Sequence, residues 1–414
     1  MKLIVCGGGI AGLSLALSLH AARIEVEVFE AAPEVAELGV GINVLPHAVR
    51  ELTELGLADE VAASGLATRE TVMFNAQGQR IWSEPSGLAE GYRWPQYSIH
   101  RGRLLGILYR ACLERLGAES VHTGRRGVEH SQDADSATLH FADGTSASGD
   151  VLVAADGLGS AIRAQLYPDE GPPVWNGTTM FRAVAHAEPP LTGASMVLIG
   201  DRRRRAVIYP ISVRDGDGLA QVNLVLDAHI SERREMARAD WHHEVERDEV
   251  HERYRDMRFD WIDVGALIEA AEPWWQYAMV DRDPLPRWSF GRVTLIGDAA
   301  HPMYPVGSNG ASQAIVDART LARTLATEPG VEPALEAYEA ARRPVTSAVI
   351  AANRDLMAVK CMELAAERAP GGFENADDIF APGELQELSD AFKRVAGFYP
   401  AELNERPSLD VVRR

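Results

Sequence analysis

Three glycines near the N-terminus have the spacing that binds the pyrophosphate of a dinucleotide. Gly7, Gly9 and Gly12 follow a short apolar run and precede an apolar, helix-like stretch. The first glycine allows a tight turn, the second lets the backbone approach the phosphates, and the third lets helix and strand pack closely. Glu30 ends the next apolar run, where a carboxylate can accept hydrogen bonds from an adenosine ribose. The motif predicts a dinucleotide at the positive end of a helix.

A second glycine-rich motif lies far along the chain. Gly297-Asp298 ends an apolar run, and a carboxylate at the carboxyl end of a parallel strand faces the ligand crevice. There it can accept from a sugar or ribityl hydroxyl, although it could instead cap the helix that follows. The segment from Pro305 to Gly310 then opens another helix, so that backbone N–H groups can approach a flat ring. Together the two motifs predict FAD held at both of its ends.

Two other segments could also contact the cofactor. Asp156-Gly157 follows a strand-like run, and an ion pair of Asp156 with Arg163 is nearly as good an interpretation as a ligand role. Ile162 replaces the last glycine of a second fingerprint there. We therefore expect NADH or NADPH only as a transient co-substrate. Arg101 begins a helix and could reach the pyrophosphate or the flavin, or could remain a surface arginine.

Composition limits the possible partners. A chain of 414 residues exceeds one hydrophobic core, which favours two domains. Its net charge of -19 opposes binding to nucleic acid and anionic lipid. Three scattered cysteines do not suggest a disulfide framework or a metal site, and no apolar run reaches the ~18 residues of a membrane span. We expect a cytoplasmic protein that is a monomer or a homodimer.

The element pattern predicts an α/β fold with a Rossmann-like FAD-binding domain, an inserted antiparallel-sheet substrate domain and C-terminal helices. The FAD-binding domain is predicted to be discontinuous, over 1–70, 98–170 and 278–330. The substrate domain takes 71–97 and 171–277, and 331–414 holds helices and a tail. Within these domains we expect a loop over 38–43, a solvated charged helix over 232–256 and a frayed tail from 400 onward.

Strand alternation suggests which side chains line a substrate pocket. Met180 and Arg182 share one face of a predicted strand, and Tyr209 and Ile211 share a face of another. Each could instead belong to the core. Arg182 is the best candidate to bind a substrate carboxylate. The run 202–205 of four arginines is expected to cap a solvated hairpin or to steer an anionic ligand, and His301 is expected to make a structural hydrogen bond.

These motifs together resemble the single-component FAD-dependent aromatic hydroxylases, which have the p-hydroxybenzoate hydroxylase-like fold, over nearly the whole chain. Five segments are most similar to the phenazine-carboxylate hydroxylase branch of that family, at 38–43, 95–101, 209–212, 279–286 and 301–310. Salicylate-hydroxylase relatives usually have a Gly-Gln-Gly run where this chain has Gly307-Ser-Asn-Gly310.

The resemblance implies a reaction. NADH or NADPH reduces FAD, the reduced flavin captures O2 as a C4a-hydroperoxide, and one oxygen enters an aromatic ring that is carboxylated and phenazine-like or salicylate-like. No side chain is expected to be catalytic, because the chemistry is borne by the flavin. A halogenase or reductase on the same fold is an alternative, although the Trp-x-Trp-x-Ile-Pro motif of halogenases is missing. A non-catalytic FAD-binding sensor is another.

The expected site therefore has two parts and no metal ligand. The cofactor-binding residues are expected to be Gly7, Gly9, Ile10, Ala11, Gly12, Glu30, Ala31, Gly41, Ile42, Arg101, Asp156, Asp298, Pro305, Gly307, Asn309 and Gly310. The substrate-binding residues are expected to be Met180, Arg182, Tyr209, Ile211 and Pro305.

Overall fold

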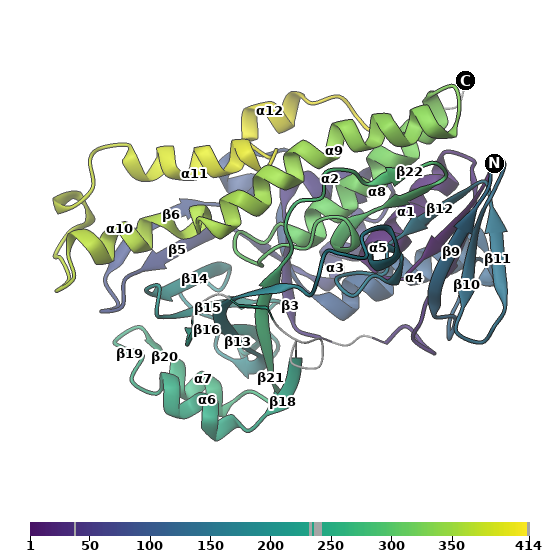
Figure 1. Cartoon of the computed structure of the whole chain (residues 1–414). Coiled ribbons are helices and arrows are strands. Elements are labelled where there is room, and N and C mark those ends of the chain that lie inside the picture. The colour runs from purple at the N-terminus through teal and green to yellow at the C-terminus, as the bar shows by residue number, and fades with distance from the viewer. Residues whose placement is uncertain (37–38, 232–233, 236–241, 412–414) are drawn as a thin grey trace.

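A six-stranded sheet forms the core around the N-terminal fingerprint (Figure 1). The computed structural model describes residues 1–36, 39–231, 234–235 and 242–411. In spatial order the strands are β22 (Ser289–Phe290), β23 (Val293–Leu295), β12 (Val151–Ala154), β1 (Lys2–Cys6), β2 (Glu25–Phe29) and β8 (Val121–His122). All neighbours are parallel except β22 and β23. The predicted βαβ unit at the start of the chain is confirmed.

Helix α1 (Ile10–Ala21) is buried along most of its length against this sheet. A helix that is apolar all round must be covered on every side, and α4 (Arg101–Leu116) and α8 (Gly310–Thr327) cover it. The other helices near this sheet are α2 (Pro46–Glu54), α3 (Ala58–Ser64) and α5 (Ala161–Leu166). A small antiparallel sheet of β9 (Gly127–Gln132), β10 (Ala137–Phe141) and β11 (Ser146–Gly149) lies at the edge. Another joins β3 (Gly41–Val44), β7 (Gln96–His100) and β4 (Leu66–Thr68).

A larger, nine-stranded sheet forms the other half of the molecule. Its path is β18 (His242–Val245), β21 (Trp274–Asp281), β13 (Val174–Ala187), β16 (Ala220–His229), β15 (Arg204–Pro210), β14 (Ser195–Gly200), β5 (Glu70–Phe74) and β6 (Arg80–Pro85), and β17 (Arg234–Glu235) pairs with β13. The pairs are antiparallel as predicted, except that β14 and β5 are parallel. The predicted domain boundaries stay a prediction, and β21 runs through the one at 278.

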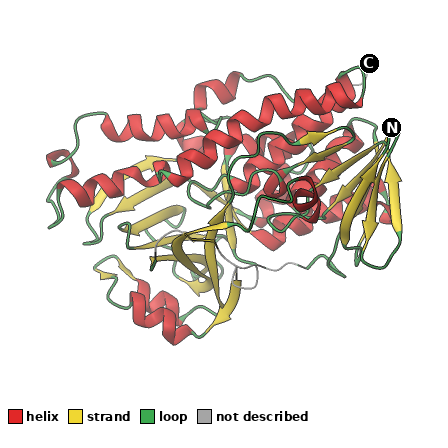
Figure 2. Cartoon of the chain, in the orientation of Figure 1, coloured by secondary structure: helices red, strands yellow, loops and turns green. Residues whose placement is uncertain are grey.

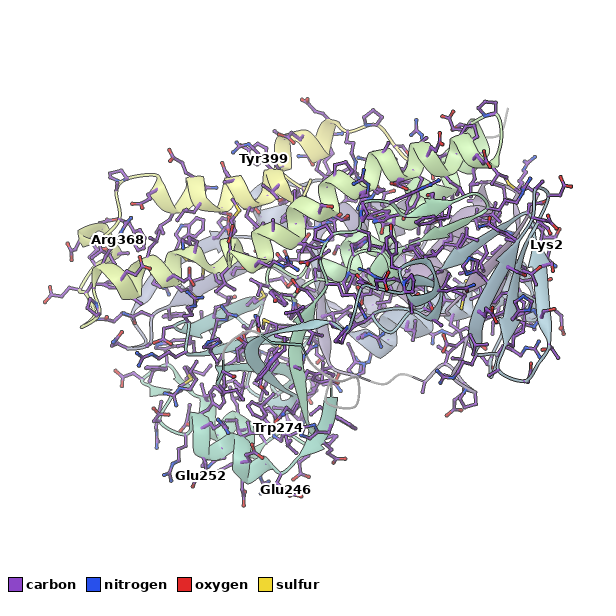
Figure 3. The ribbon with its side chains drawn as sticks, in the orientation of Figure 1. Lys2, Glu246, Glu252, Trp274, Arg368 and Tyr399 are labelled. Carbon is purple, nitrogen blue, oxygen red and sulfur yellow. The ribbon has the colours of Figure 1, made fainter. Side chains whose placement is uncertain are left out.

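The two faces of the larger sheet have different neighbours. One face packs against α6 (Arg247–Tyr254) and α7 (Val264–Glu269), and Trp274 is buried in that core (Figure 3). The hairpin of β19 (Arg258–Phe259) and β20 (Ile262–Asp263) lies beside them. The opposite face packs against the C-terminal part of the chain. That part contains α9 (Val331–Arg354), α10 (Lys360–Arg368), α11 (Glu384–Val395) and α12 (Pro400–Glu405), and Figure 2 shows these helices along one side of the molecule.

Three predicted elements are wrong. The charged stretch 232–256 is helical over α6, whereas His242–Val245 forms the edge strand β18, which pairs with β21. Residues 232–233 and 236–241 lie outside the described part. The loop expected over 38–43 contains the start of β3, which pairs with a strand distant in sequence, while residue 38 is not described. The tail does not fray at 400, because α12 buries Leu403 and Arg406 bonds to Glu51. Within the described residues, no helix has the length and apolar character to cross a membrane.

Candidate functional site

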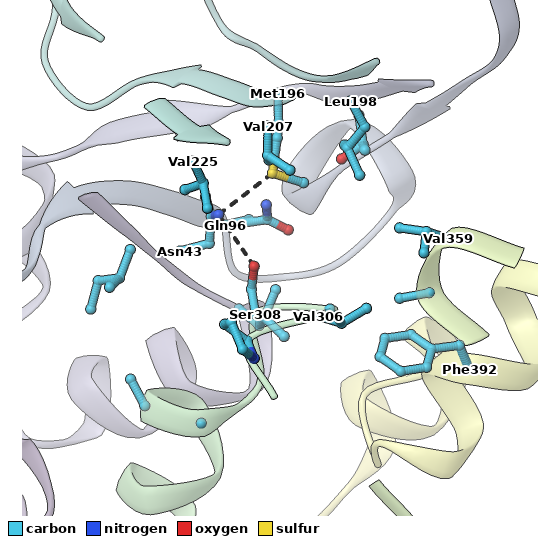
Figure 4. A pocket seen from close by; sticks show the side chains of 18 of the residues that line it. Asn43, Gln96, Met196, Leu198, Val207, Val225, Val306, Ser308, Val359 and Phe392 are labelled. Atoms are coloured by element: carbon cyan, nitrogen blue, oxygen red, sulfur yellow. Dashed lines mark hydrogen bonds between the residues drawn. The ribbon is translucent and has the colours of Figure 1, made fainter. Parts of the chain in front are cut away.

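A cavity of about 490 Å³ lies where the two sheets and the C-terminal helices meet. The fingerprint turn and the 298–310 segment line one part of it, and α11 lines another. The strands of the larger sheet supply an apolar wall, of which Figure 4 labels Met196, Leu198, Val207 and Val225. The cavity therefore joins a predicted dinucleotide site to a predicted substrate pocket in one space.

The three fingerprint glycines have different roles. A Cβ at Gly12 would lie 2.0 Å from the Gly7 carbonyl oxygen, and a Cβ at Gly7 would lie 2.3 Å from that of Ala155. These two glycines are needed for packing, and neither lines the cavity. A Cβ at Gly9 would meet nothing within 4 Å, and Gly9 lines the cavity with Ile10 and Ala11. Gly9 thus leaves open the space where a pyrophosphate would meet the N-terminus of α1.

Glu30 lies beside the fingerprint but outside the cavity lining. Its carboxylate accepts hydrogen bonds from the backbone N–H groups of Gly8 (2.7 Å) and Ala32 (2.8 Å). Ala31 lies outside the lining as well. In this structure Glu30 holds the fingerprint turn in shape.

Asp298 lies at the start of the short helix η4 (Gly297–Ala299), with its side chain exposed to the cavity. The surrounding protein keeps water from the Asp298 carboxylate, and this desolvation raises its pKa. The positive charges of His301 and Arg101 oppose the shift. A Cβ on Gly310, at the N-terminus of α8, would have Asp298 Oδ1 as its nearest neighbour at 4.0 Å. The cavity is lined by Asp298, Arg101, Pro305 and Gly310. It therefore brings together a hydrogen-bond acceptor in Asp298, a positive charge in Arg101 and the helix N-terminus at Gly310.

A buried network fixes the position of this segment. His301 Nε2 lies 2.5 Å from Asp317 Oδ2, and Arg342 Nε donates to Asp317 Oδ1 at 2.6 Å. Asp317 also accepts from the Gly297 N–H at 3.2 Å. Burial opposes ionisation of Asp317, but His301 and Arg342 outweigh it and lower the pKa to about 2. The structural hydrogen bond expected for His301 is confirmed.

The turn at Gly307 and Ser308 has two consecutive residues with positive φ, of 76° and 58°. A Cβ at Gly307 would lie 2.3 Å from the ring of Phe392, so this glycine is needed for packing against α11. Ser308 accepts a hydrogen bond from Asn43 Nδ2 at 3.3 Å (Figure 4). Asn309 is fully buried, bonds to Gly307 and Gln313, and does not line the cavity.

Arg182 and Tyr209 both line the cavity and both donate to the Gly41 carbonyl, at 2.8 and 3.0 Å. These two hydrogen bonds attach β3 to the larger sheet, and β3 in turn brings Ile42 to the cavity. Gly41 is outside the lining because it packs on Asn223 and Ile211, and Ile211 is fully buried beneath it. Burial raises the pKa of Tyr209 to about 12, with Arg182 opposing. Met180 lines the cavity, whereas Phe181 packs on the other face, as alternation predicts.

The ion pair considered between Asp156 and Arg163 is wrong. Arg163 instead bonds to Glu170 and to the carbonyls of Ala299 and Ala300. Asp156 Oδ2 accepts from the N–H of Ala161 at 2.8 Å, and its Oδ1 is buried with no partner in the described part of the chain. Asp156 is not part of the cavity lining, although its neighbours on both sides are.

Sequence reasoning missed several polar residues of the cavity. Arg205 does not cap a solvated hairpin, because it is buried and pairs with Asp227 at 2.5 Å, whereas Arg202 and Arg203 are exposed. Alternation along β15 could have found it, since Arg205 shares a face with Tyr209. The missed polar residues also include Glu84, Glu90, Tyr92, Gln96, Ser389 and Lys393. Except for Gln96, which lies in the segment 95–101, these residues come from segments that no motif marks.

Comparison with known proteins agrees with this geometry. The family model described as FAD binding domain matches residues 1–353. The chain is 43% identical over 362 residues to phenazine 1,6-dicarboxylic acid hydroxylase PhzS of Lysobacter antibioticus, covering 85% of this chain and 89% of that protein. It is 33% identical over 354 residues to 3-hydroxybenzoate 6-hydroxylase 1 of Aquipseudomonas alcaligenes, covering 84% and 86%.

A solved structure shows the same fold. The crystal structure of a variant of HpxO from Klebsiella pneumoniae, complexed with FAD, matches with a TM-score of 0.78 at 24% identity. The match covers 97% of this chain and 100% of that one. The predicted fold and enzyme class are confirmed. The chain belongs to the family with this FAD binding domain, and it is an FAD-dependent hydroxylase of the monooxygenase class.

Proposed function

We propose that this enzyme inserts one oxygen atom into a carboxylated, phenazine-like aromatic substrate, with NADH or NADPH as the reductant. The main support is the single cavity that joins Gly9 and Asp298 to the apolar wall of the larger sheet. The name of the relative from Lysobacter antibioticus supports the phenazine class. Bound FAD supplies the redox chemistry that activates O2. A salicylate-like ring stays a second candidate, because the relative from Aquipseudomonas alcaligenes is a hydroxybenzoate hydroxylase.

The residues present fit FAD. Gly9 leaves room for a pyrophosphate, and Asp298 offers an acceptor for a hydroxyl group beside the N-terminus of α8. We propose that Ile10, Ala11, Ile42, Arg101, Pro305 and Gly310 contact the cofactor together with these two residues. Gly7, Gly12, Glu30, Ala31, Gly41, Asp156, Gly307 and Asn309 then act by shaping the walls around it.

The larger sheet would hold the substrate. Met180, Met196 and Val225 form a water-poor surface for a flat ring. Arg182 and Arg205 bring positive charge to this wall, and the Nε of Arg182 is buried with no partner among the residues described. We propose that these guanidinium groups orient the substrate carboxylate, which places the opposite edge of the ring toward the flavin. Burial beside Asp227 keeps Arg205 fixed in position.

Replacing Asp298 tests its role in binding FAD. The Asp298→Ala variant should bind FAD about 10- to 100-fold more weakly, because a hydrogen bond to a charged acceptor contributes about 1.5–3 kcal/mol. Titration of the apoprotein with FAD, followed by quenching of flavin fluorescence, measures this. Asp377→Ala is the matched control, since Asp377 is exposed and outside the cavity. Equal FAD affinity in the two variants would contradict the assignment.

The reaction itself can be tested with a panel of aromatic carboxylates that includes phenazine-1-carboxylate and salicylate. We expect a phenazine carboxylate to stimulate NADH or NADPH oxidation at least tenfold and to gain one oxygen atom by mass spectrometry. A sensor without turnover would bind FAD but show no stimulated oxidation. Halide incorporation in place of oxygen would indicate the halogenase alternative.

We also propose a cytoplasmic location, which the three cysteines support because all are buried and free. That the protein is a monomer or a homodimer stays a prediction.

A further inference from the structure

A buried group of charged residues lies in the part of the cavity beside α11. Lys393 binds the carboxylates of Glu84 on β6 and Glu90 on η1 (Gly87–Glu90). Ser389, one turn earlier on α11, donates to Glu84. These four residues, the Lys393 cluster, all line the cavity. Figure 1 shows α11 and β6 on the left of the view and α1 on the right.

The Lys393 cluster has more negative than positive charge. Two carboxylates share one ammonium group, and Lys393 is only 6% exposed. Burial raises the pKa of Glu90 to about 7, with Lys393 opposing and the charge of Glu84 adding to the shift. A further anion placed here would be repelled, whereas a group that donates a hydrogen bond to Glu90 would be favoured.

Tyr92 adds an unsatisfied hydroxyl to the same wall. Its side chain is 4% exposed and lines the cavity, yet its Oη has no hydrogen-bond partner in the described ranges. Burial and the nearby charges of Glu90 and Glu84 raise the pKa of Tyr92, so it remains a neutral donor. A buried donor without an acceptor costs free energy, which a ligand oxygen can recover.

We propose that Tyr92 and the Lys393 cluster form a subsite for an uncharged hydroxyl group on the aromatic substrate, at the end remote from its carboxylate. Tyr92 donates to the oxygen of that hydroxyl, and Glu90 accepts its proton in a hydrogen bond. A methoxy group at this position cannot donate, and a second carboxylate meets the negative cluster. This subsite rests on the proposed function, because it assigns the far end of the same substrate.

Rigid two-ring probes test the subsite in the FAD-loaded enzyme. They are 6-hydroxy-2-naphthoate, 6-methoxy-2-naphthoate and naphthalene-2,6-dicarboxylate, with dissociation constants from the change in flavin absorbance. In the unmodified enzyme the hydroxy probe should bind at least tenfold more tightly than either of the others. Tyr92→Phe should weaken binding of the hydroxy probe about tenfold, because the hydroxyl oxygen loses its donor. Tyr97→Phe, a half-buried tyrosine outside the cavity, should leave that affinity unchanged.

A second variant keeps the test decisive if Tyr92→Phe does not fold. Glu90→Gln removes one negative charge and should strengthen binding of the dicarboxylate about tenfold. Equal affinities for the three probes in the unmodified enzyme would overturn the subsite, and so would unchanged affinities in both variants. If a substrate gains oxygen but the affinity for the hydroxy probe does not depend on Tyr92, only the subsite fails. If that affinity depends on Tyr92 but no aromatic carboxylate is oxygenated, the subsite stands and the proposed function fails.

Discussion

The Gly9→Val variant should purify as a folded protein that contains no FAD. Gly9 has φ near -76° in extended backbone, so valine can adopt its conformation, and a Cβ there meets nothing within 4 Å. Valine would instead fill the space where the backbone approaches a pyrophosphate, and it would keep the phosphates away from the N–H groups of α1. We expect FAD affinity to fall at least 100-fold. Absorbance near 450 nm after incubation with FAD and gel filtration measures the loss.

The Gly12→Val variant is the matched comparison. Here the Cβ would lie 2.0 Å from the Gly7 carbonyl and 3.3 Å from the Val5 side chain, so the helix must move off the sheet. Overpacking of this kind costs about 1–3 kcal/mol or more. Thermal unfolding of the two apoproteins should therefore show a normal midpoint for Gly9→Val and a lowered one for Gly12→Val. If Gly9→Val retained yellow colour and activity, the pyrophosphate would have to lie elsewhere.

The local motifs of this sequence predict the structure around them well, because they specify both backbone and packing. The fingerprint fixes the turn between β1 and α1, since two of its glycines are needed at contacts that leave no space for a Cβ. Alternation likewise places Met180 and Phe181 on opposite faces of β13. In both cases the residues that interact lie close together in the sequence or repeat with the period of the element.

The wrong predictions involve partners that are distant in sequence. β3 resembles a loop because its strand character depends on pairing with β7. The segment 242–245 is charged like a solvated helix, yet it pairs with β21 at the edge of the larger sheet. The Lys393 cluster joins residues more than 300 positions apart, and each alone is an ordinary surface residue type. No local pattern carries such information.

The predicted site contains a success and an error that both arise within local segments of the chain. Asp298 and Gly310 line the cavity because their motif sets the end of a strand and the start of a helix. The sequence suggests Asp156 as a partner of Arg163 because the two opposite charges flank the same strand-to-helix turn. The structure gives Arg163 a better partner in Glu170, which a turn after α5 brings to its guanidinium.

Replacing Asp317 should produce the largest loss of stability. Asp317→Asn keeps the shape of the side chain but replaces an acceptor oxygen with a donor, which would face the donors on His301, Arg342 or Gly297. Removing one partner of a buried ion pair costs about 3–5 kcal/mol. We expect urea unfolding of the FAD-saturated variant to show that loss in the free energy of unfolding. Asp377→Asn, at an exposed position, should change it by less than about 0.5 kcal/mol.

The pH dependence distinguishes a charge effect from a loss of packing. Asp317 has a pKa of about 2 in the folded protein, below the ordinary value of 3.8. A carboxylate whose pKa is lowered by folding adds stability that is complete above its ordinary pKa and is lost as the pH falls through the folded value. The stability difference between wild type and Asp317→Asn should therefore narrow as the pH falls from about 4 to about 2. A difference that stays constant over this range would show that the ionised form of Asp317 does not stabilise the fold.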